Sequence, residues 1–276
     1  MAVPLTDDEY RLFRDWLLRE YGLHFGPEKR EILRARLEPR RVALNLDSFE
    51  ALLFRVRHHP GQEMERAALI SRLTNNESYF FRTTGQLDVL RREVLPAAAS
   101  AAGARPVRIL SAGCASGEEP YTLAILAREV LGPGRSVAIT GVDVDRSALE
   151  RAREGIYRRH ALRGLDEDIR DRYFLREAEE RWRLREEIRA AARFQQGNIV
   201  DPAWSDTVPP QDVVFCRNVL IYFDADATRR AVDSLYRAVR PGGYLFLGHA
   251  ESLSRIPNRF VTERRPGAVF HRRPKV

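Results

Sequence analysis

The sequence predicts an α/β protein in which a doubly wound, mostly parallel sheet follows an all-α N-terminal domain and carries a small antiparallel β-subdomain. Three observations support this fold class. Residues 1–75 show only helical periodicity. From residue 106, apolar strand segments alternate with amphipathic helices, which is the pattern of a parallel sheet covered by helices. Residues 172–196 interrupt this alternation with short strand-like segments. The 276 residues suffice for one medium domain and a smaller companion.

The predicted N-terminal domain, residues 1–75, is a small bundle of short amphipathic helices. Thr6-Asp-Asp-Glu9 is a capping box, and Gly22 ends the helix that it begins. Pro27 suits the first turn of a second helix. The apolar side of that second helix is expected to carry Ile32, Leu33, Leu37 and Leu44. Further helices before residue 75 complete the bundle.

Residues 76–105 are predicted to join the two domains, with a helix over residues 86–94 and a flexible linker of small residues over 97–105. The second domain, residues 106–276, carries the β-subdomain at about residues 172–196. Its main strands are expected at residues 107–111, 137–142, 212–216 and 244–248, and its helices at 118–131, 147–154 and 225–239. The antiparallel strands of the insertion are expected at Tyr173-Phe-Leu, Trp182-Arg-Leu and Arg193-Phe-Gln.

Composition and charge exclude several classes of protein. No apolar stretch approaches the roughly 18 residues of a membrane-spanning helix. Cys114 and Cys216 lie in apolar segments, so we expect them to be reduced thiols of a cytoplasmic protein. The histidines show no metal-ligand spacing, so we expect no metal site. Most of the net charge of +7 lies in residues 255–276, and such a tail either binds nucleic acid or is simply solvated. Residues 1–75 hold 13 basic and 12 acidic residues, so we expect no nucleic-acid partner.

The turn after the first predicted strand is a candidate ligand site. Small residues there let a ligand approach the backbone. They are Ala112, Gly113, Ala115 and Gly117. The next helix begins with Glu118 and Glu119, which would repel a pyrophosphate and suit a ligand that carries an ammonium or sulfonium group. The alternatives are tight packing between strand and helix, and ordinary helix capping.

A carboxylate ends the second predicted strand, in Gly141-Val-Asp143. At this position it can accept the hydroxyl groups of a ribose. The alternative is that Asp143 caps the next helix, but Asp145 is the better candidate for that cap. A loop for a cationic chain and an acid for a ribose together describe S-adenosyl-L-methionine. The sequence chemistry therefore suggests a methyltransferase.

Polar residues also follow the strand at 212–216. Arg217 and Asn218 interrupt an apolar run, so we expect them to meet a ligand or a polar network. Tyr222 can guide the methyl acceptor or belong to the core. The Asn/Asp-Pro-Pro-Tyr element typical of adenine methylation does not follow this strand, and no Cys-His or Ser-His-Asp set is visible. A carboxylate acceptor fits this absence, because it is ionised at neutral pH and needs no general base.

Four motifs occur in order along the chain. They are Asn75-Asn-Glu-Ser-Tyr-Phe-Phe-Arg82, Ser116-Gly-Glu-Glu-Pro-Tyr121, Phe215-Cys-Arg-Asn-Val-Leu-Ile-Tyr-Phe223 and Gly248-His-Ala-Glu-Ser252. Through them the chain resembles the CheR family, the chemotaxis receptor methyltransferases, over essentially its whole length. The resemblance implies an α-helical domain, a Rossmann-like methyltransferase sheet and a small β-subdomain. It also implies that S-adenosyl-L-methionine methylates glutamate side chains of chemoreceptor cytoplasmic helices, leaving S-adenosyl-L-homocysteine.

The resemblance assigns roles in the site motif by motif. Glu118 or Glu119 is implied to hold the amino group of the cofactor, and Asp143 its ribose. Other cofactor contacts are implied for Asn76, Ser78, Arg82, Ala112, Gly113, Asn198, Ile199, Arg217 and Asn218. Arg82 and Tyr222 resemble the pair that orients the acceptor carboxylate. Arg82 suits this role because a guanidinium can hold a carboxylate through two hydrogen bonds.

The resemblance also gives the basic second helix a use, although a solvated charged face is the alternative. The arginines expected to meet the acidic receptor helices are Arg34, Arg36, Arg40 and Arg41. Some family members dock on a peptide at the receptor C-terminus through a longer loop that contains glycine. Here Arg176-Glu-Ala-Glu-Glu-Arg181 is short and lacks glycine. We therefore expect an enzyme that needs no tether. The cysteines indicate a cytoplasmic protein, and a monomer is the default expectation. A catalytically silent sensor or adaptor, or an RNA methyltransferase, is the rival interpretation.

Overall fold

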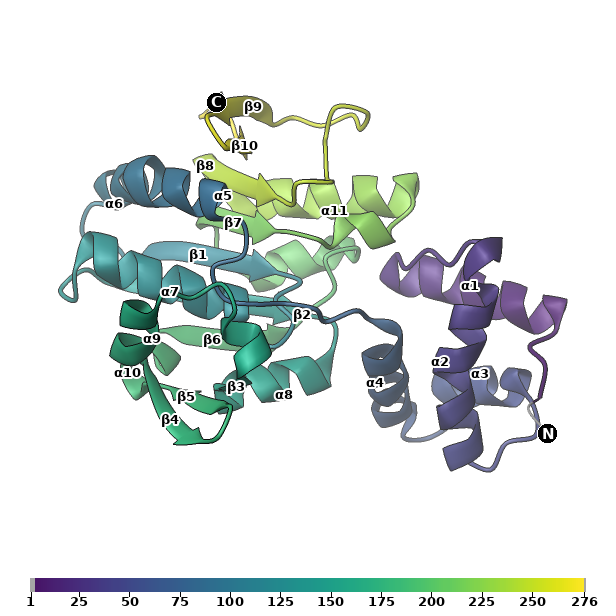
Figure 1. Ribbon diagram of the computed structural model, residues 1–276. Coiled ribbons are helices and arrows are strands. Elements are labelled where there is room, and N and C mark those ends of the chain that lie inside the picture. Colours follow the sequence, from purple (N-terminus) through teal and green to yellow (C-terminus); the bar gives the residue numbers. More distant parts are fainter. Residues whose placement is uncertain (1–2, 276) are drawn as a thin grey trace.

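The computed structural model describes residues 3–275, and it shows a helical N-terminal unit beside a larger α/β unit (Figure 1). The N-terminal unit is built from α1 (Asp7–Tyr21), the short 3-10 helix η1 (Pro27–Lys29), α2 (Arg30–Ala43), α3 (Phe49–His58) and α4 (Gln62–Leu73). The larger unit holds the main sheet, with helices on both faces. Across this described part of the chain, no helix is both long and apolar enough to cross a bilayer.

The N-terminal helices pack around one apolar cluster. Its fully buried side chains include Phe13, Leu17, Leu33, Leu37, Phe49 and Leu52. The predicted capping box of Thr6 and Glu9 is confirmed, and Gly22 ends α1 in the left-handed conformation with φ 72°. The prediction that Ile32 belongs to the buried side of α2 is wrong, because Ile32 is 50 % exposed.

Glu9 also joins the first helix to the third. Its carboxylate accepts the backbone N–H of Thr6 at 2.9 Å, and its second oxygen accepts the N–H groups of Phe49 at 2.9 Å and Glu50 at 3.1 Å. Burial raises the pKa of Glu9, but the hydrogen bonds from Thr6, Glu50 and Phe49 together lower that pKa by more, so it lies below its ordinary value. One carboxylate thus satisfies backbone donors at the starts of two helices.

The main sheet has the strand order β6-β2-β1-β7-β8-β10-β9. Its strands are β1 (Val107–Ala112), β2 (Val137–Asp143), β6 (Ala192–Gln196), β7 (Gln211–Cys216), β8 (Val239–Leu247), β9 (Val261–Arg265) and β10 (Ala268–Arg272). The pairs from β6 to β8 are parallel, whereas β10 runs antiparallel to both of its neighbours. The doubly wound fold class is confirmed, and the hairpin of β9 and β10 adds an edge that the sequence patterns did not predict.

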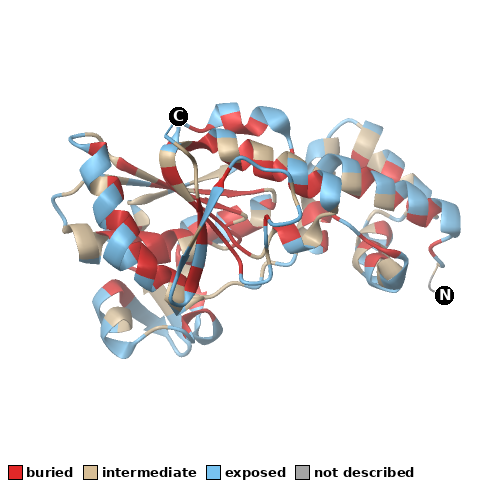
Figure 2. Cartoon of the chain, turned by 90° about the horizontal axis from the view of Figure 1, so that it is seen from above, coloured by how far each residue is buried: buried red, intermediate tan, exposed pale blue. Residues whose placement is uncertain are grey.

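Helices cover both faces of this sheet, and they are α6 (Leu95–Ala102), α7 (Glu118–Leu131), α8 (Arg146–Glu154) and α11 (Ala225–Ala238). Alternate residues of a strand face opposite layers. Val213 and Phe215 join the cluster that contains α6 and α7, while Val214 and Cys216 join the cluster that contains α11. The central strands are therefore buried on both sides, as Figure 2 shows by their red colour.

Residues 97–102 are helical, so the prediction of a flexible linker is wrong there. The chain continues from α5 (Thr84–Val89) through a π-helical turn, η2 (Leu90–Val94), into α6. Pro96 lies in the first turn of α6, where proline is tolerated, and the following alanines favour a helix. Ala98 and Ala102 are buried in the core beside the sheet. Small residues here allow close packing rather than mobility.

The antiparallel β-subdomain has the order β3-β5-β4, with β3 (Ile156–Arg158), β4 (Phe174–Ala178) and β5 (Arg181–Leu184). The strands predicted at Tyr173-Phe-Leu and Trp182-Arg-Leu lie mainly in β4 and β5. The assignment of Arg193-Phe-Gln is wrong, because these residues belong to β6 and pair in parallel with β2. The smaller helical elements are η3 (Arg159–Leu162), α9 (Glu167–Tyr173), α10 (Glu186–Arg189), η4 (Pro202–Thr207) and η5 (Leu220–Tyr222).

We predict that Glu9→Gln lowers the free energy of unfolding by about 1–3 kcal/mol at pH 7, because an amide replaces a charged acceptor of several N–H groups. The Glu9 pKa is lowered by folding, so its stabilisation is present above the unfolded pKa and disappears as the pH falls through the folded value. Urea unfolding between pH 7 and pH 3 should therefore show a shallower acid slope for the variant. Equal slopes for both proteins would contradict this assignment.

Candidate active site

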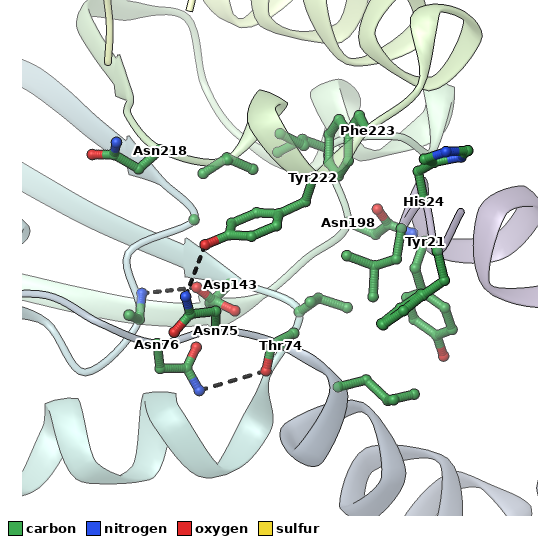
Figure 3. Close-up of a pocket in the computed structure, with 18 of the residues that line it drawn as sticks. Tyr21, His24, Thr74, Asn75, Asn76, Asp143, Asn198, Asn218, Tyr222 and Phe223 are labelled. Atoms are coloured by element: carbon green, nitrogen blue, oxygen red, sulfur yellow. Dashed lines mark hydrogen bonds between the residues drawn. The ribbon is translucent and has the colours of Figure 1, made fainter. Parts of the chain in front are cut away.

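A cavity of about 240 Å³ lies between the two units, where β1, β2, β6 and β7 end (Figure 3). In open α/β sheets this edge is the usual ligand site. The helical unit closes the other side with the segment that follows α1. The lining includes Leu23, His24, Phe25, Asn76, Gly113, Asp143, Asn198, Ile199, Val219 and Tyr222. An apolar wall with a few polar groups from the sheet edge suits a nucleoside.

A smaller, more polar cavity of about 90 Å³ adjoins the first. Asn75, Gly113, Ala115, Asn218 and Tyr222 line both cavities. The smaller cavity is further lined by Glu77, Ser78, Tyr79, Arg82, Cys114, Glu119, Arg217 and Ile221. The arrangement therefore offers one apolar compartment and one charged compartment that meet at Tyr222.

Asp143 lies on the wall of the larger cavity and is 7 % exposed. One carboxylate oxygen accepts the backbone N–H of Ala115 at 2.8 Å, and the other accepts the N–H of Asp145 at 2.9 Å. Burial raises the pKa of Asp143 above its ordinary value. Each carboxylate oxygen can still accept a further hydrogen bond. Asp143 can therefore fix the loop after β1 and also receive ligand hydroxyl groups.

Asp145 connects the helical unit to the sheet. As predicted, it caps α8, accepting the N–H of Ala148 at 3.1 Å. Its other oxygen accepts side-chain hydrogen bonds from Ser71 at 3.1 Å, Thr74 at 3.3 Å and Asn76 at 2.6 Å. Asn76 was predicted to contact the cofactor. It does line the larger cavity, but its amide nitrogen is directed to Asp145.

The small residues of the loop after β1 serve packing as well as ligand access. A Cβ on Gly113 would lie 2.3 Å from a methyl group of Val219, and the backbone φ there is 75°. Gly113 lines both cavities, as predicted for a cofactor contact. Ala112 is fully buried in the core beside α11 and lines neither cavity, so its cofactor contact stays a prediction.

Of the two acidic residues at the start of α7, Glu119 lines the smaller cavity. Its carboxylate accepts hydrogen bonds from Ser111 at 2.7 Å and from the Nε of Arg217 at 2.5 Å. Glu118 is turned to Ser116, which donates to it at 2.8 Å, and burial raises the pKa of Glu118. Arg217 and Glu119 thus form a buried ion pair beside the charged compartment.

The predicted acceptor pair, Arg82 and Tyr222, lies on the smaller cavity. Asn75 donates a hydrogen bond to the Tyr222 hydroxyl at 3.0 Å, which Figure 3 marks with a dashed line. The Tyr222 carbonyl accepts the backbone N–H of His24 at 2.8 Å, so the helical unit holds this residue too. Arg82 donates to the Glu77 carbonyl at 3.2 Å. The structure therefore brings both predicted residues to one compartment.

The remaining predicted cofactor residues also lie at the cavities. Asn198 and Ile199 line the larger cavity, and the Asn198 amide donates to the carbonyl of Glu20 at 2.6 Å. Ser78 lines the smaller cavity, and Asn218 lines both. Arg217 reaches the pocket wall while its guanidinium donates to the carbonyl of Arg82 at 2.8 Å.

The basic helix α2 differs from its prediction in part. Arg41 is 8 % exposed, pairs with Glu38 at 2.8 Å and lies over the ring of Phe49. Its assignment to a partner surface is therefore wrong, because its charge is neutralised within the bundle. Arg36 donates to the carbonyl of Leu73 at 2.6 Å and lines the larger cavity.

Two other arginines of α2 remain partly accessible. The Arg34 side chain is 27 % exposed and pairs with Glu31 at 2.8 Å. The Arg40 side chain is 24 % exposed and pairs with Glu65 of α4. The pair of Arg34 with the largely exposed Glu31 is weak and can be exchanged for contacts with a partner, whereas Glu65 is only 14 % exposed, so the Arg40 pair lies mostly within the bundle.

Several residues at or beside the site received no role from the sequence alone. Phe25 lines the larger cavity and lies outside the quoted motifs, whereas Asn75 and Glu251 lie inside them. Asn75 binds the Tyr222 hydroxyl, and the Glu251 carboxylate accepts backbone N–H groups of the segment that leads to Tyr222. Their positions inside the motifs were the only signal in the sequence that pointed to them. The groups that they bind could be identified only from the folded structure.

We predict that Asp145→Ala lowers the free energy of unfolding by about 2–4 kcal/mol, because it removes a helix cap and also the hydrogen bonds that join the two units. Asp224→Ala is the matched control, since Asp224 caps α11 through the N–H of Ala227 at 2.8 Å. That control should cost about 1 kcal/mol. Urea unfolding measures both values, and equal losses would contradict the joining role of Asp145.

Comparison with known proteins identifies the family. Residues 8–74 match the family model described as CheR methyltransferase, all-alpha domain, and residues 76–268 match CheR methyltransferase, SAM binding domain. The chain is 36 % identical over 264 residues to chemotaxis protein methyltransferase 2 of Vibrio cholerae, covering 95 % of this chain and 91 % of that protein. It is 34 % identical over 275 residues to the chemotaxis protein methyltransferase of Vibrio parahaemolyticus, covering 98 % of each. The chain therefore belongs to the CheR family and is an S-adenosyl-L-methionine-dependent methyltransferase of chemotaxis.

Proposed function

We propose that this enzyme transfers the methyl group of S-adenosyl-L-methionine to glutamate side chains on the cytoplasmic helices of chemoreceptors. The observation that carries the proposal is the pair of adjoining cavities, with Arg82 and Tyr222 in the charged one. The product is a glutamyl methyl ester. The enzyme then acts as a monomer in the cytoplasm, and it neither enters the membrane nor binds nucleic acid.

The residues of the two cavities fit the cofactor. Asp143 has free acceptor positions for ribose hydroxyl groups, and Ile199 and Phe25 offer apolar surface for an adenine. Glu119 stands in the charged cavity, where it can attract an amino group. Bound there, S-adenosyl-L-methionine supplies an activated methyl group on a sulfonium. Gly113 and Asn218 line the junction through which its chain would run.

The acceptor side requires positioning rather than a base, because a glutamate carboxylate is already ionised at neutral pH. Among the described residues, the Arg82 side chain makes one hydrogen bond, to the carbonyl of Glu77, so its other N–H groups can hold a carboxylate. The Tyr222 hydroxyl accepts from Asn75 and therefore keeps its own proton to donate. Together they can orient an acceptor oxygen toward the junction of the cavities.

Receptor docking is assigned to α2 through its partly exposed arginines, with Arg34 the more accessible, Arg40 paired with Glu65, and Arg36 on the wall of the larger cavity. Methylation segments rich in glutamate complement this charge. Ile32 and Val42, on the same helix, are 50 % and 60 % exposed and add apolar surface. A helix that combines arginine and apolar side chains is a reasonable contact for an amphipathic receptor helix.

The β-subdomain supports the proposal that no tether is needed. Its strands β4 and β5 are joined by Glu179 and Glu180 alone, and Glu180 has a φ of 56°. Such a short, acidic turn offers few residues that could contact a bound peptide.

We predict that wild-type enzyme adds base-labile radiolabelled methyl groups to chemoreceptor cytoplasmic fragments. Arg82→Ala should lower kcat/KM about 10–100-fold through loss of charge-assisted hydrogen bonds to the acceptor. Asp143→Ala should instead weaken S-adenosyl-L-homocysteine binding about tenfold or more, measured by calorimetry. Arg229→Ala, which alters an exposed pair with Asp226 on α11, is the control. No labile label on any receptor fragment, with cofactor still bound, would refute the proposed acceptor.

We predict that receptor fragments with and without their C-terminal residues are methylated at equal rates. The reason is the short turn between β4 and β5, which lacks the loop used for tethering. A calorimetric titration with the tethering pentapeptide of the family should show no binding at micromolar concentrations. Micromolar affinity would contradict the prediction and place the peptide on the β-subdomain after all.

A further inference from the structure

The Glu251 carboxylate lies beneath the segment that follows β7. It accepts the backbone N–H groups of Asn218 at 2.9 Å, Val219 at 2.8 Å and Leu220 at 2.7 Å. It also accepts the N–H of Gly248 at 2.6 Å, at the end of β8. Four backbone donors thus converge on one side chain, and hydrogen bonds to a charged acceptor are the strong ones.

This segment has an irregular backbone that needs such support. Asn218 adopts a φ of 60°, which is uncommon for a residue other than glycine. Consecutive N–H groups that point to one centre form an anion-binding concavity. Here a carboxylate of the same chain fills it. Gly248 is part of the device, because a Cβ there would lie 2.6 Å from the Glu251 carboxylate and 2.9 Å from the Asn218 nitrogen.

The supported segment carries side chains of both cavities. Asn218 and Tyr222 line both, and Val219 fits against Gly113 of the loop after β1. The hydroxyl of Tyr222 meets Asn75 only if the segment keeps its place. A shift of Leu220 would move the short helix η5, which contains Tyr222. The position of the tyrosine therefore depends on the carboxylate below it.

We propose that Glu251 is a positioning residue for methyl transfer, which acts by fixing the backbone from Asn218 to Leu220 and so placing Tyr222. The inference rests on the proposed function, since Tyr222 is assigned there to the acceptor. Glu251 itself lines neither cavity and reaches the site only through the backbone of this segment. Small displacements of a positioning group can cost a large factor in rate.

Glu251→Gln is the decisive variant. An amide keeps one acceptor oxygen but presents an NH2 group to two backbone donors, so the segment loses part of its support. We expect kcat on receptor fragments to fall about 10–100-fold. The dissociation constant for S-adenosyl-L-homocysteine should rise by a smaller factor than kcat falls, because Asn218 and Val219 form only part of the cofactor cavity, whereas Tyr222 acts on the acceptor. Amide hydrogen exchange in residues 217–223 should become faster, which is a readout independent of turnover.

Glu9→Gln is the matched control, because Glu9 also accepts several backbone N–H groups but lies in the helical bundle away from both cavities. It should lower stability and leave kcat unchanged. A double-mutant cycle that combines Glu251→Gln with Tyr222→Phe tests whether Glu251 acts through Tyr222. If Glu251 acts through Tyr222, the loss caused by Glu251→Gln is much smaller in the Tyr222→Phe background. Glu251→Asp, which keeps the charge but shortens the reach, serves if the glutamine variant does not fold.

The outcomes of these experiments distinguish failure of the proposed function from failure of the positioning role of Glu251. Wild-type enzyme that fails to methylate any receptor fragment refutes the proposed function, and with it the role of Glu251 in that reaction. An active wild type, with Glu251→Gln as fast as Glu9→Gln, overturns the inference alone. Full additivity with Tyr222→Phe also overturns it, because Glu251 would then act by another route. A reduced kcat with faster exchange in residues 217–223 and non-additivity supports it.

Discussion

The buried carboxylate of Asp145 is the interaction on which the site depends. It is fully buried, and an unpaired carboxylate in such surroundings would be costly. Its partners come from both units: the N–H of Ala148 from α8, and the side chains of Ser71, Thr74 and Asn76 from the end of α4 and beyond. Docking of the helical unit therefore supplies hydrogen-bond donors to a buried carboxylate of the sheet unit. Because the larger cavity is walled by both units, it exists only when this docking is complete.

The same chemistry recurs where the backbone leaves regular structure. Asp143 holds Ala115, which has a φ of 48°, and Glu251 holds Asn218, which has a φ of 60°. Strained backbone persists only where surrounding contacts over-determine it. In both places a carboxylate supplies those contacts through N–H groups that a regular sheet would otherwise have paired. Ala115 and Asn218 are thus each held by a side-chain carboxylate, although neither residue lies in a helix or a strand.

Local signals in the sequence predicted most of the fold and the neighbourhood of the site. The capping box at Thr6, the left-handed end at Gly22 and the alternation of strands and helices each depend on neighbours in sequence. One error arose where a distant partner decides, because Phe194 lies in a parallel strand in which Gly141 of the neighbouring strand leaves room for its ring. Arg41 has nearer partners, Glu38 on the same helix and Phe49 on the next, but the charge pattern of α2 does not reveal that they bury it. Motifs located Asn75 and Glu251 without revealing what they bind.

Two arginines near the charged cavity illustrate why folding rather than composition assigns a role. Arg217 is 8 % exposed and commits its guanidinium to Glu119 and to the carbonyl of Arg82. That pair leaves the inner wall nearly neutral, so it does not repel an incoming carboxylate or a cationic methyl donor. Arg82 is more exposed and keeps donors free, while water competes for them. Under the proposed function this difference is useful, because an acceptor that is held too tightly would lose nucleophilicity, whereas a partly solvated arginine can orient the oxygen and still leave its electrons available.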